Sequence, residues 1–407
     1  MTIKIAVVGA GAAGYFFALN FYEKLKKKSA VKIDVLEQSS RVLNKVRISG
    51  GGRCNVTHFE FDEKRLSQSY PRGQRELLGP FHHFGTQDVM NWFEKRGVSL
   101  KVEVDGRVFP KSNLSSEIID LFESLRRQYK INLKSQYKVS SIKQDGDQFI
   151  LNQKDRYDYV FWATGSDKSA WNVLSRFGES VSKLYPSLFS FHINDPLIKE
   201  LSGLSFKKVL VSFKRTKGEL SVSGDLLITH KGLSGPAILK LSSFSAVDFG
   251  EKNYNFKIKV NFLNEDLNDD NLRKIYAKKN VAHLPVLKKL PQRFVQNAIA
   301  LVGLHEKKVA DLSKTDFETL RNTFLNKEFE VTGKSTHKEE FVTAGGVSLK
   351  TINFKTFEAK SSQGLFFAGE VLNIDAITGG YNFQNAWTGS YIAATALSDR
   401  LNQAQQE

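Results

Sequence analysis

A glycine pattern near the N-terminus constrains the fold more than any other feature of this sequence. Gly9-x-Gly11-x-x-Gly14 lies between an apolar run that predicts a buried strand and a helix predicted over residues 12–28. A second strand is predicted over residues 31–37, so the chain opens with a βαβ unit. In this context the first glycine permits a tight turn, the second lets backbone amides approach a pyrophosphate, and the third lets the helix pack closely on the strand.

An acidic residue completes this pattern. Glu37 ends the second predicted strand, 23 residues after Gly14, and Gln38 follows it. An acid at this position can accept hydrogen bonds from both ribose hydroxyls of an adenosine. The alternative is a glycine-rich turn followed by a surface glutamate. The combined pattern predicts a dinucleotide site, which could hold NAD or FAD.

Three further stretches favour FAD. Residues 49–55 read Ser-Gly-Gly-Gly-Arg-Cys-Asn, in which three glycines expose backbone N–H groups and Arg53 adds a fixed cation. Ala163-Thr164-Gly165 ends another predicted strand. Near the C-terminus a strand over residues 365–368 leads through two acids and a glycine pair into the last predicted helix. A helix N-terminus suits the negative charge that a reduced flavin carries near N1 and the C2 carbonyl.

Composition limits the class of protein. The 407 residues are 41% hydrophobic and 25% charged, as in ordinary globular proteins. No apolar run reaches the ~20 residues of a membrane helix. The N-terminus does not resemble a signal peptide, so we expect a cytoplasmic protein without membrane contact. The single cysteine, Cys54, excludes an intramolecular disulfide, and a packing role is favoured over a reactive thiol. No metal motif is present.

The positive charge is unevenly distributed. The chain has 59 Lys and Arg against 43 Asp and Glu, a net charge of +16. Residues 201–310 contain 19 basic and 9 acidic residues. A solvated basic face is one interpretation of this excess. The other is a contact surface for RNA through the basic residues of 207–308.

The pattern of predicted elements divides the chain. We expect an α/β fold with a discontinuous Rossmann domain over residues 1–185 and 345–407. Short alternating strands predict a β-barrel insertion over residues 186–264 and 331–344. Residues 265–330 predict a small, basic helical insertion.

Several long motifs resemble those of one bacterial family, the YhiN/BaiN-type conserved flavoproteins, also called aminoacetone-oxidase-like FAD-binding enzymes. The motifs are ISGGGRCNVTH (48–58), RVFPKS (107–112), YPSLFSF (185–191), LLITHKGLSGPAIL (226–239), VTAGGVSL (342–349) and GLFFAGEVLNIDAITGGYNFQNAWTGSYIAA (364–394). The resemblance covers nearly the whole chain. It implies a glutathione-reductase-type FAD domain interrupted by a β-barrel and a small helical insertion.

The resemblance also implies roles for individual residues. The pyrophosphate would lie against Gly9, Gly11, Ala13 and Gly14, the ribose against Glu37, and the adenine against Val139. Lys45 stands where the family has a basic residue before the glycine triplet. The residues expected around the flavin, its ribityl chain and the linked phosphates are Ser49, Gly51, Gly52, Arg53, Asn55, Ala163, Thr164, Gly165, Gly369, Glu370, Asp375, Gly379, Gly380, Tyr381 and Asn382. Tyr381 could pack on the flavin or begin a buried helix face.

One loop departs from the family. Many members continue after Ala163-Thr164 with a second glycine and a Ser-x-Pro-x-x-Gly-Ser run, whereas here Gly165 is followed by Ser-Asp-Lys-Ser-Ala-Trp. This difference affects the substrate side of the expected site and leaves the FAD side unchanged.

The predicted function is that of an FAD-dependent oxidoreductase that transfers hydride through the flavin, with NAD(P)H as a transient reductant. Small molecules and RNA both remain as substrates. One alternative is flavin-dependent reduction of uridine in ribosomal RNA. A second is an FAD-containing RNA-binding protein without turnover. The sequence assigns no catalytic acid or base.

Overall fold

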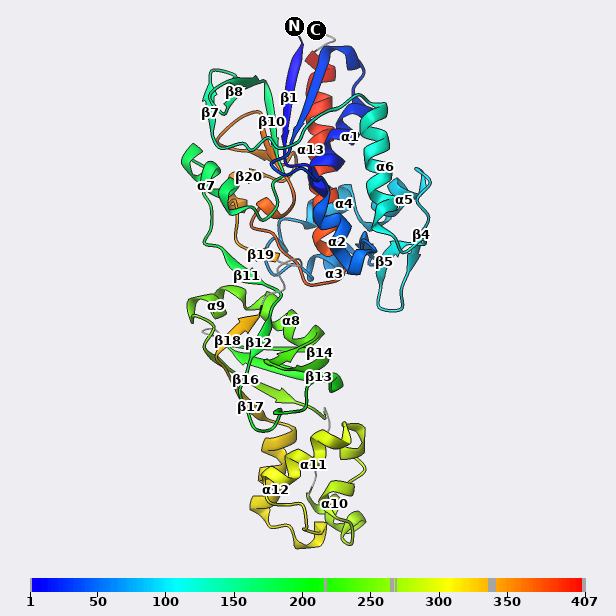
Figure 1. Cartoon of the computed structure of the whole chain (residues 1–407), viewed down its shortest axis with the longest axis vertical. Helices are drawn as coiled ribbons and strands as arrows, with labels where there is room; N and C mark the ends of the chain where they lie inside the picture. Colours follow the sequence, from blue (N-terminus) through cyan, green and yellow to red (C-terminus); the bar gives the residue numbers. More distant parts are fainter. Residues whose placement is uncertain (1, 216–217, 264–266, 268, 336–341, 405–407) are drawn as a thin grey trace. The chain divides into compact units, whose positions relative to one another are not determined.

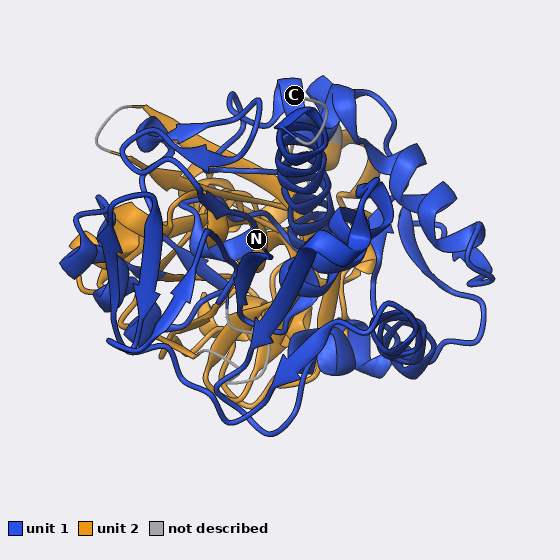
Figure 2. Cartoon of the chain, turned by 90° about the horizontal axis from the view of Figure 1, so that it is seen from above, with its two compact units in different colours: residues 1–185, 338–407 blue, residues 186–337 orange. Residues whose placement is uncertain are grey.

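The computed structural model describes residues 2–215, 218–263, 267, 269–335 and 342–404. The chain forms two compact units (Figure 2). The first contains residues 1–185 and 338–407, and the second contains residues 186–337. The helices of residues 269–324 therefore group with the antiparallel strands in one unit, and the three-part division expected from the sequence stays a prediction.

The first unit is built on a mixed sheet with the strand order β20-β21-β22-β10-β1-β2-β6, which is parallel from β22 to β6 and antiparallel where β21 pairs with β20 and β22. Strand β10 lies at its centre and pairs in parallel with β22 and with β1, while β1 pairs in parallel with β2. These strands are β1 (Ile3–Val8), β2 (Val31–Leu36), β6 (Asn132–Lys134), β10 (Tyr159–Trp162), β20 (Ile352–Asn353), β21 (Glu358–Ala359) and β22 (Leu365–Phe367). Strands from both ends of the chain thus share one sheet, which is the Rossmann-like arrangement predicted from the glycine pattern.

Two long helices pack together in this unit (Figure 1). They are α1 (Ala12–Lys24) and α13 (Tyr381–Ala404). The Ser390 hydroxyl donates to the Ala13 carbonyl at 2.9 Å and fixes their contact. The other helices are α2 (Asn44–Gly52), α3 (Glu63–Ser67), α4 (Leu78–His83), α5 (Thr86–Glu94), α6 (Ser115–Gln128), α7 (Lys168–Phe177), η1 (Lys28–Ala30), η5 (Leu349–Thr351) and η6 (Gly369–Val371).

Small sheets complete the first unit. One has the order β3-β5-β4 and another the order β7-β8-β9. The strands are β3 (Thr57–His58), β4 (Leu100–Val102), β5 (Arg107–Pro110), β7 (Ile142–Asp145), β8 (Gln148–Leu151), β9 (Asp155–Tyr157) and β19 (Val342–Ala344).

The second unit contains a seven-stranded antiparallel sheet that runs from β17 at one edge to β18 at the other. Its strands are β12 (Ser190–His192), β13 (Ser205–Lys214), β14 (Glu219–Thr229), β15 (Gly232–Ser234), β16 (Phe256–Asn261), β17 (Lys327–Val331) and β18 (Gly333–Ser335); β11 (Tyr185–Ser187) precedes them. The helices are α8 (Pro236–Phe244), α9 (Ala246–Glu251), α10 (Asp269–Tyr276), η2 (Val281–His283), η3 (Leu287–Lys289), α11 (Gln292–Leu301), η4 (Val309–Asp311) and α12 (Lys314–Phe324).

Each unit has its own hydrophobic core. The first is rich in aromatic rings, such as Phe16, Phe93 and Trp387, all fully buried. The second is built around residues such as Phe249, Phe294 and Phe329. A search of the described helices finds none whose length and hydropathy would allow it to span a bilayer.

The helix predicted over residues 12–28 is four residues too long. It ends at Lys24, and Leu25 has the extended dihedral angles φ −67° and ψ 128°. Lys24, Lys26, Lys27 and Lys28 crowd four positive charges into five residues. Like charges this close in a helix repel one another, which disfavours its continuation.

Candidate functional site

The three glycines of the N-terminal pattern differ in what surrounds them. A Cβ atom on Gly9 would lie 2.5 Å from the Ala163 carbonyl oxygen, and Gly9 has a φ of +104°. A Cβ atom on Gly14 would lie 1.9 Å from the Gly9 carbonyl oxygen. Both positions therefore need glycine for the fold itself. A Cβ atom on Gly11 would meet no atom within 4 Å, and its φ of −91° is accessible to any residue. The open space at Gly11 is room for a ligand.

Gly11 is also the N-cap residue of α1. No side chain caps this helix end, and its first turn contains no acidic residue. Unpaired N–H groups and the positive end of the helix dipole therefore lie at Gly11, with no capping side chain and no acid in the first turn. This combination fits a pyrophosphate, which accepts hydrogen bonds and carries negative charge.

Glu37 lies directly beside this turn. Its carboxylate accepts hydrogen bonds from the Ala10 amide at 2.9 Å and from the Ser39 amide and hydroxyl at 2.9 and 2.8 Å. The Gly9 amide bonds to the end of the same strand, at the Leu36 carbonyl, at 2.8 Å. The fold thus fixes the acid next to the glycine turn, as a ribose contact requires. Gln38 is exposed.

The glycine triplet interrupts α2. Gly50, Gly51 and Gly52 have φ angles of 58°, 69° and 84°, three consecutive left-handed residues that only glycine adopts readily. Gly50 packs against the Phe109 ring, where a Cβ atom would come within 2.8 Å. Gly51 has no atom within 4 Å of such a Cβ position. The triplet therefore presents bare backbone on its open side, and the Ser49 hydroxyl bonds back to the Val46 carbonyl at 3.0 Å.

Arg53 fixes this loop. Its Nε donates to the Gly50 carbonyl at 3.1 Å, and its guanidinium forms an ion pair with Glu103 at 2.6 Å and lies 4.0 Å from the centre of the Phe109 ring. The sequence predicts Arg53 as a cation for the cofactor. In the structure its charge is paired with Glu103, and its bond to the Gly50 carbonyl holds the glycine triplet in place.

Asn55 connects the triplet to the start of α13. In the amide orientation that satisfies its neighbours, Asn55 donates to the carbonyls of Thr57 and Val108 and accepts from the Gly380 amide at 2.9 Å. A Cβ atom on Gly380 would lie 2.5 Å from the Thr57 carbonyl oxygen. The glycine pair at 379–380 thus lets this helix end approach the segment that follows the triplet.

An aromatic cluster holds the first turn of α13. The rings of His58 and Tyr381 stack with their centres 4.5 Å apart, and the Tyr70 hydroxyl donates to the Tyr381 carbonyl at 2.6 Å. Tyr381 is 7% exposed. Tyr381 thus lies in a buried helix face, and its packing on the flavin stays a prediction. Burial lowers the pKa of His58, although its contact with the Gly379 carbonyl acts in the opposite direction.

Two polar side chains reinforce this turn from within. Gln384 is fully buried and accepts from the Thr57 hydroxyl at 2.5 Å, while its own amide donates to Thr388 at 3.0 Å. Sequence reasoning missed His58, Tyr70 and Gln384. His58 and Gln384 lie close to the two glycine-rich motifs, whereas Tyr70 lies outside them and had no such signal.

Asp375 and Asn382 support the loop before α13. Asp375 is fully buried and forms a bidentate ion pair with Arg72. Asn382 closes the loop by accepting from the Ala376 amide at 3.0 Å and donating to the Ala376 carbonyl at 3.3 Å. Both residues were expected to contact the cofactor directly. Their observed contacts are with the protein, which shapes the loop.

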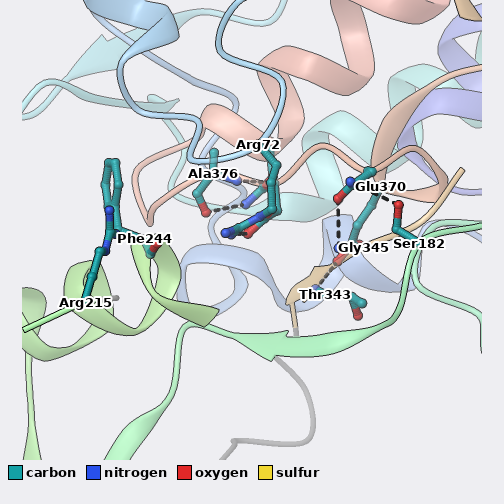
Figure 3. A network of polar contacts seen from close by, with 11 residues as sticks. Arg72, Ser182, Arg215, Phe244, Thr343, Gly345, Glu370 and Ala376 are labelled. Atoms are coloured by element: carbon teal, nitrogen blue, oxygen red, sulfur yellow. Dashed lines mark hydrogen bonds and ion pairs between the residues drawn. The ribbon is translucent and has the colours of Figure 1, made fainter. Parts of the chain in front are cut away.

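Glu370 joins three segments of the first unit. One carboxylate oxygen forms an ion pair with Lys45, whose ammonium also donates to the Ser166 hydroxyl at 2.7 Å. The other accepts from the Thr343 amide at 3.1 Å (Figure 3). A Cβ atom on Gly165 would lie 3.9 Å from the Glu370 carboxylate. The predicted residues Lys45, Gly165 and Glu370 therefore meet at one place.

The remaining predicted residues are largely buried. Ala13, Val139 and Ala163 are between 5% and 8% exposed and belong to the core of the first unit. Thr164 accepts a hydrogen bond from the Trp162 indole at 3.2 Å. Gly369 packs against α1, where a Cβ atom would lie 3.3 Å from that of Ala13. Among these residues, Ala163 and Thr164 lie directly against Gly9 of the glycine turn.

Comparison with known proteins agrees with this site. A ribosomal RNA dihydrouridine synthase of Haemophilus influenzae is 27% identical, with 96% of this chain and 98% of the relative covered. The enzyme of the same name from Escherichia coli is 26% identical, with 96% of this chain and 97% of that relative covered. A 3-dehydro-bile acid delta(4,6)-reductase of Clostridium scindens is 24% identical, with 98% of this chain and 99% of that relative covered. The family model described as "HI0933-like protein Rossmann domain" matches residues 3–396. This chain therefore belongs to the HI0933-like family of flavoproteins.

Proposed function

We propose that this protein is an FAD-dependent reductase that saturates a carbon–carbon double bond, with uracil in ribosomal RNA as its substrate and NAD(P)H as its reductant. The observation that carries the cofactor assignment is the open backbone at Gly11, on an uncapped helix end beside Glu37. These groups match the pyrophosphate and ribose of a dinucleotide in chemistry and in order.

The residues that would hold FAD divide into two sets. Gly11 and the first amides of α1 would bind the pyrophosphate, and Glu37 the adenosine ribose. Gly51 and the start of α13 would approach the flavin. When bound, FAD supplies a site that accepts hydride from NAD(P)H and passes it to one carbon of the double bond. The other carbon takes a proton, so NAD(P)H, a proton and an alkene give NAD(P)⁺ and an alkane.

The choice of RNA rests on two observations. Two relatives that this chain matches along nearly their whole lengths are named for the synthesis of dihydrouridine in ribosomal RNA. The second unit is strongly basic: residues 272–309 contain nine Lys and Arg and one acid. Such a charge favours a polyanionic substrate over a small neutral one.

A second candidate is the reduction of a small unsaturated molecule, which the name of the bile acid reductase favours. The basic second unit does not explain such a substrate. A third candidate, an RNA-binding protein that keeps FAD without turnover, predicts no reduction of the flavin by any nicotinamide.

Two measurements test the proposal. Anaerobic addition of NADPH or NADH to the yellow protein should bleach the flavin absorbance, and ribosomal RNA should then restore it. Mass spectrometry of ribosomal RNA from a deletion strain should show the loss of a dihydrouridine. The wild-type gene should restore this nucleoside, and a Gly11→Val gene should not. An unchanged nucleoside profile in the deletion strain would remove the RNA assignment.

A further inference from the structure

The lysines of the second unit differ in whether acidic groups neutralise them. On the sheet, Lys207 pairs with Asp225 at 2.6 Å, and Lys257 pairs with Glu328 at 2.7 Å. Arg215 lies 3.7 Å from Asp248 and donates to the Phe244 carbonyl at 2.7 Å (Figure 3). The protein itself therefore compensates much of the positive charge predicted for the strands.

The helical part of the unit is different. Within residues 272–309 the only acid is Glu306. Among the residues that the structure describes, Lys278 and Lys308 have no acidic group within 4 Å. Lys307 does have a partner, Asp316, at 2.9 Å. The Lys307 ammonium and the Ser313 amide lower the pKa of Asp316 to about 2. Both side chains of this pair are therefore ionised, and their opposite charges cancel.

Two segments distant in sequence bring Lys308 beside Asn280, two residues after Lys278. Asn280 and Lys308 face each other in an antiparallel bridge. The Val281 amide donates to the Lys307 carbonyl at 3.2 Å, and the Val309 amide donates to the Lys279 carbonyl at 3.0 Å. In this type of bridge the directly opposed side chains lie close together and on the same side. Asn280 and Lys308 are therefore neighbours on one face.

The burial of individual residues shows which side this is. Val281 and Val309, the next residues along each segment, are fully buried. Lys308 is exposed and Asn280 is partly exposed, so this pair lies at the surface. Lys278 lies two residues before Asn280 and is exposed, as is Lys308. Lys279 remains exposed beside the Tyr276 ring, 5.3 Å from its centre.

We propose that this lysine face, formed by Lys278, Asn280 and Lys308, binds the phosphate backbone of the RNA substrate. The inference rests on the proposed function for the choice of partner. Lysine ammonium groups act as point charges that displace counterions from phosphates, and an asparagine amide adds a hydrogen-bond donor. Contacts with phosphates carry no sequence information, so the lysine face positions RNA and leaves sequence selection to the site of reduction.

The test compares two double variants of the holoprotein that lose the same charge. Lys278→Gln/Lys308→Gln removes the lysine face, and Lys207→Gln/Lys257→Gln removes two exposed lysines that have acidic partners. Binding of fluorescein-labelled oligouridine is followed by anisotropy between about 50 and 200 mM salt. Each phosphate contact on a single strand contributes ~0.7 to the slope of log K against log salt. We expect the lysine-face variant to lose about 1.4 in slope and to bind roughly 25-fold more weakly near 0.1 M salt.

The paired-lysine variant should keep the wild-type slope. Equal losses in both variants, or none in the lysine-face variant, would overturn the proposal. So would equal weakening of binding to phosphatidylserine vesicles, because the face would then bind any anionic surface and not RNA in particular. Flavin content and bleaching by NADPH are measured in parallel. If the lysine face binds RNA but the deletion strain keeps its dihydrouridine, the surface stands and the proposed reaction fails.

Discussion

A methyl group placed on Gly14 would lie 1.9 Å from the carbonyl oxygen of Gly9, whereas one placed on Gly11 would touch nothing. The two positions belong to one sequence pattern, but the structure separates their roles. Gly9 and Gly14 allow strand, turn and helix to pack. Gly11 leaves space at an uncapped helix end, which is useful only when a ligand occupies it.

This difference predicts opposite behaviour for two variants. Gly11→Val should fold with wild-type stability, because its φ of −91° and ψ of −166° suit valine, but it should bind no FAD. Gly14→Ala should lower the free energy of unfolding by at least the ~1–3 kcal/mol typical of overpacking. The new methyl group would meet the backbone carbonyl of Gly9, which cannot move away. Urea unfolding of the apoproteins and flavin absorbance after reconstitution measure the two effects. Full flavin content in Gly11→Val would contradict the pyrophosphate assignment.

Local patterns explain how much of this site was predictable. The glycine spacing, the position of Glu37 and the parallel strands follow from residues close in sequence, and the structure has the predicted βαβ unit. The pairing of Arg53 with Glu103 and of Arg72 with Asp375 joins residues 50 and 303 positions apart. In a sequence, a charged residue near a glycine motif looks available to bind a cofactor. Only tertiary packing decides whether another side chain has already neutralised it.

Asp375 and Arg72 give a second prediction. Removal of one partner from a buried ion pair leaves an uncompensated charge and costs about 3–5 kcal/mol. We expect Arg72→Met to destabilise the protein by this amount, because Asp375 is fully buried. Arg72→Met/Asp375→Leu should recover part of the loss. Urea unfolding measures both. Asp145→Asn is the matched control, because its pair with Arg156 is half exposed and should contribute less than about 1 kcal/mol. Equal effects at the two sites would show that the Asp375 pair is not a structural element.

Cys54 should be chemically inert in the folded protein. Burial raises the pKa of this thiol to about 12, and the hydrogen bond with Ser49 opposes this rise only in part. At about pH 8 only about one molecule in ten thousand would carry the reactive thiolate. Iodoacetamide should therefore leave the native holoprotein unmodified and label it fully in urea, as mass spectrometry would show. Rapid labelling of the native protein would contradict this prediction and would favour a redox or nucleophilic role for Cys54.

Asp34 predicts how stability depends on pH. The side chain is 4% exposed on β2, and its carboxylate lies 2.8 Å from the Asn132 amide and 2.9 Å from the Lys134 ammonium. Burial alone would raise the pKa of Asp34, but the hydrogen bonds from Asn132, Lys134 and Tyr157 outweigh it and lower the pKa below its ordinary value. The folded state thus favours the charged form more than the unfolded chain does, in which the pKa is about 3.9.

The sign of the effect follows from this difference. The contribution of Asp34 to the free energy of unfolding is fully present above about pH 4. It is lost as the pH falls through the lower pKa that Asp34 has in the folded state. Asp34→Asn should therefore be less stable than the wild type at neutral pH, by about 1–3 kcal/mol for lost charge-assisted hydrogen bonds. This difference in stability between the wild type and Asp34→Asn should narrow below about pH 4, where the wild type also loses the charge. Urea midpoints at a series of pH values measure this gap, with Asp147→Asn on an exposed turn as the control. A gap that stays constant down to acid pH would mean that packing, and not the carboxylate charge, accounts for the loss.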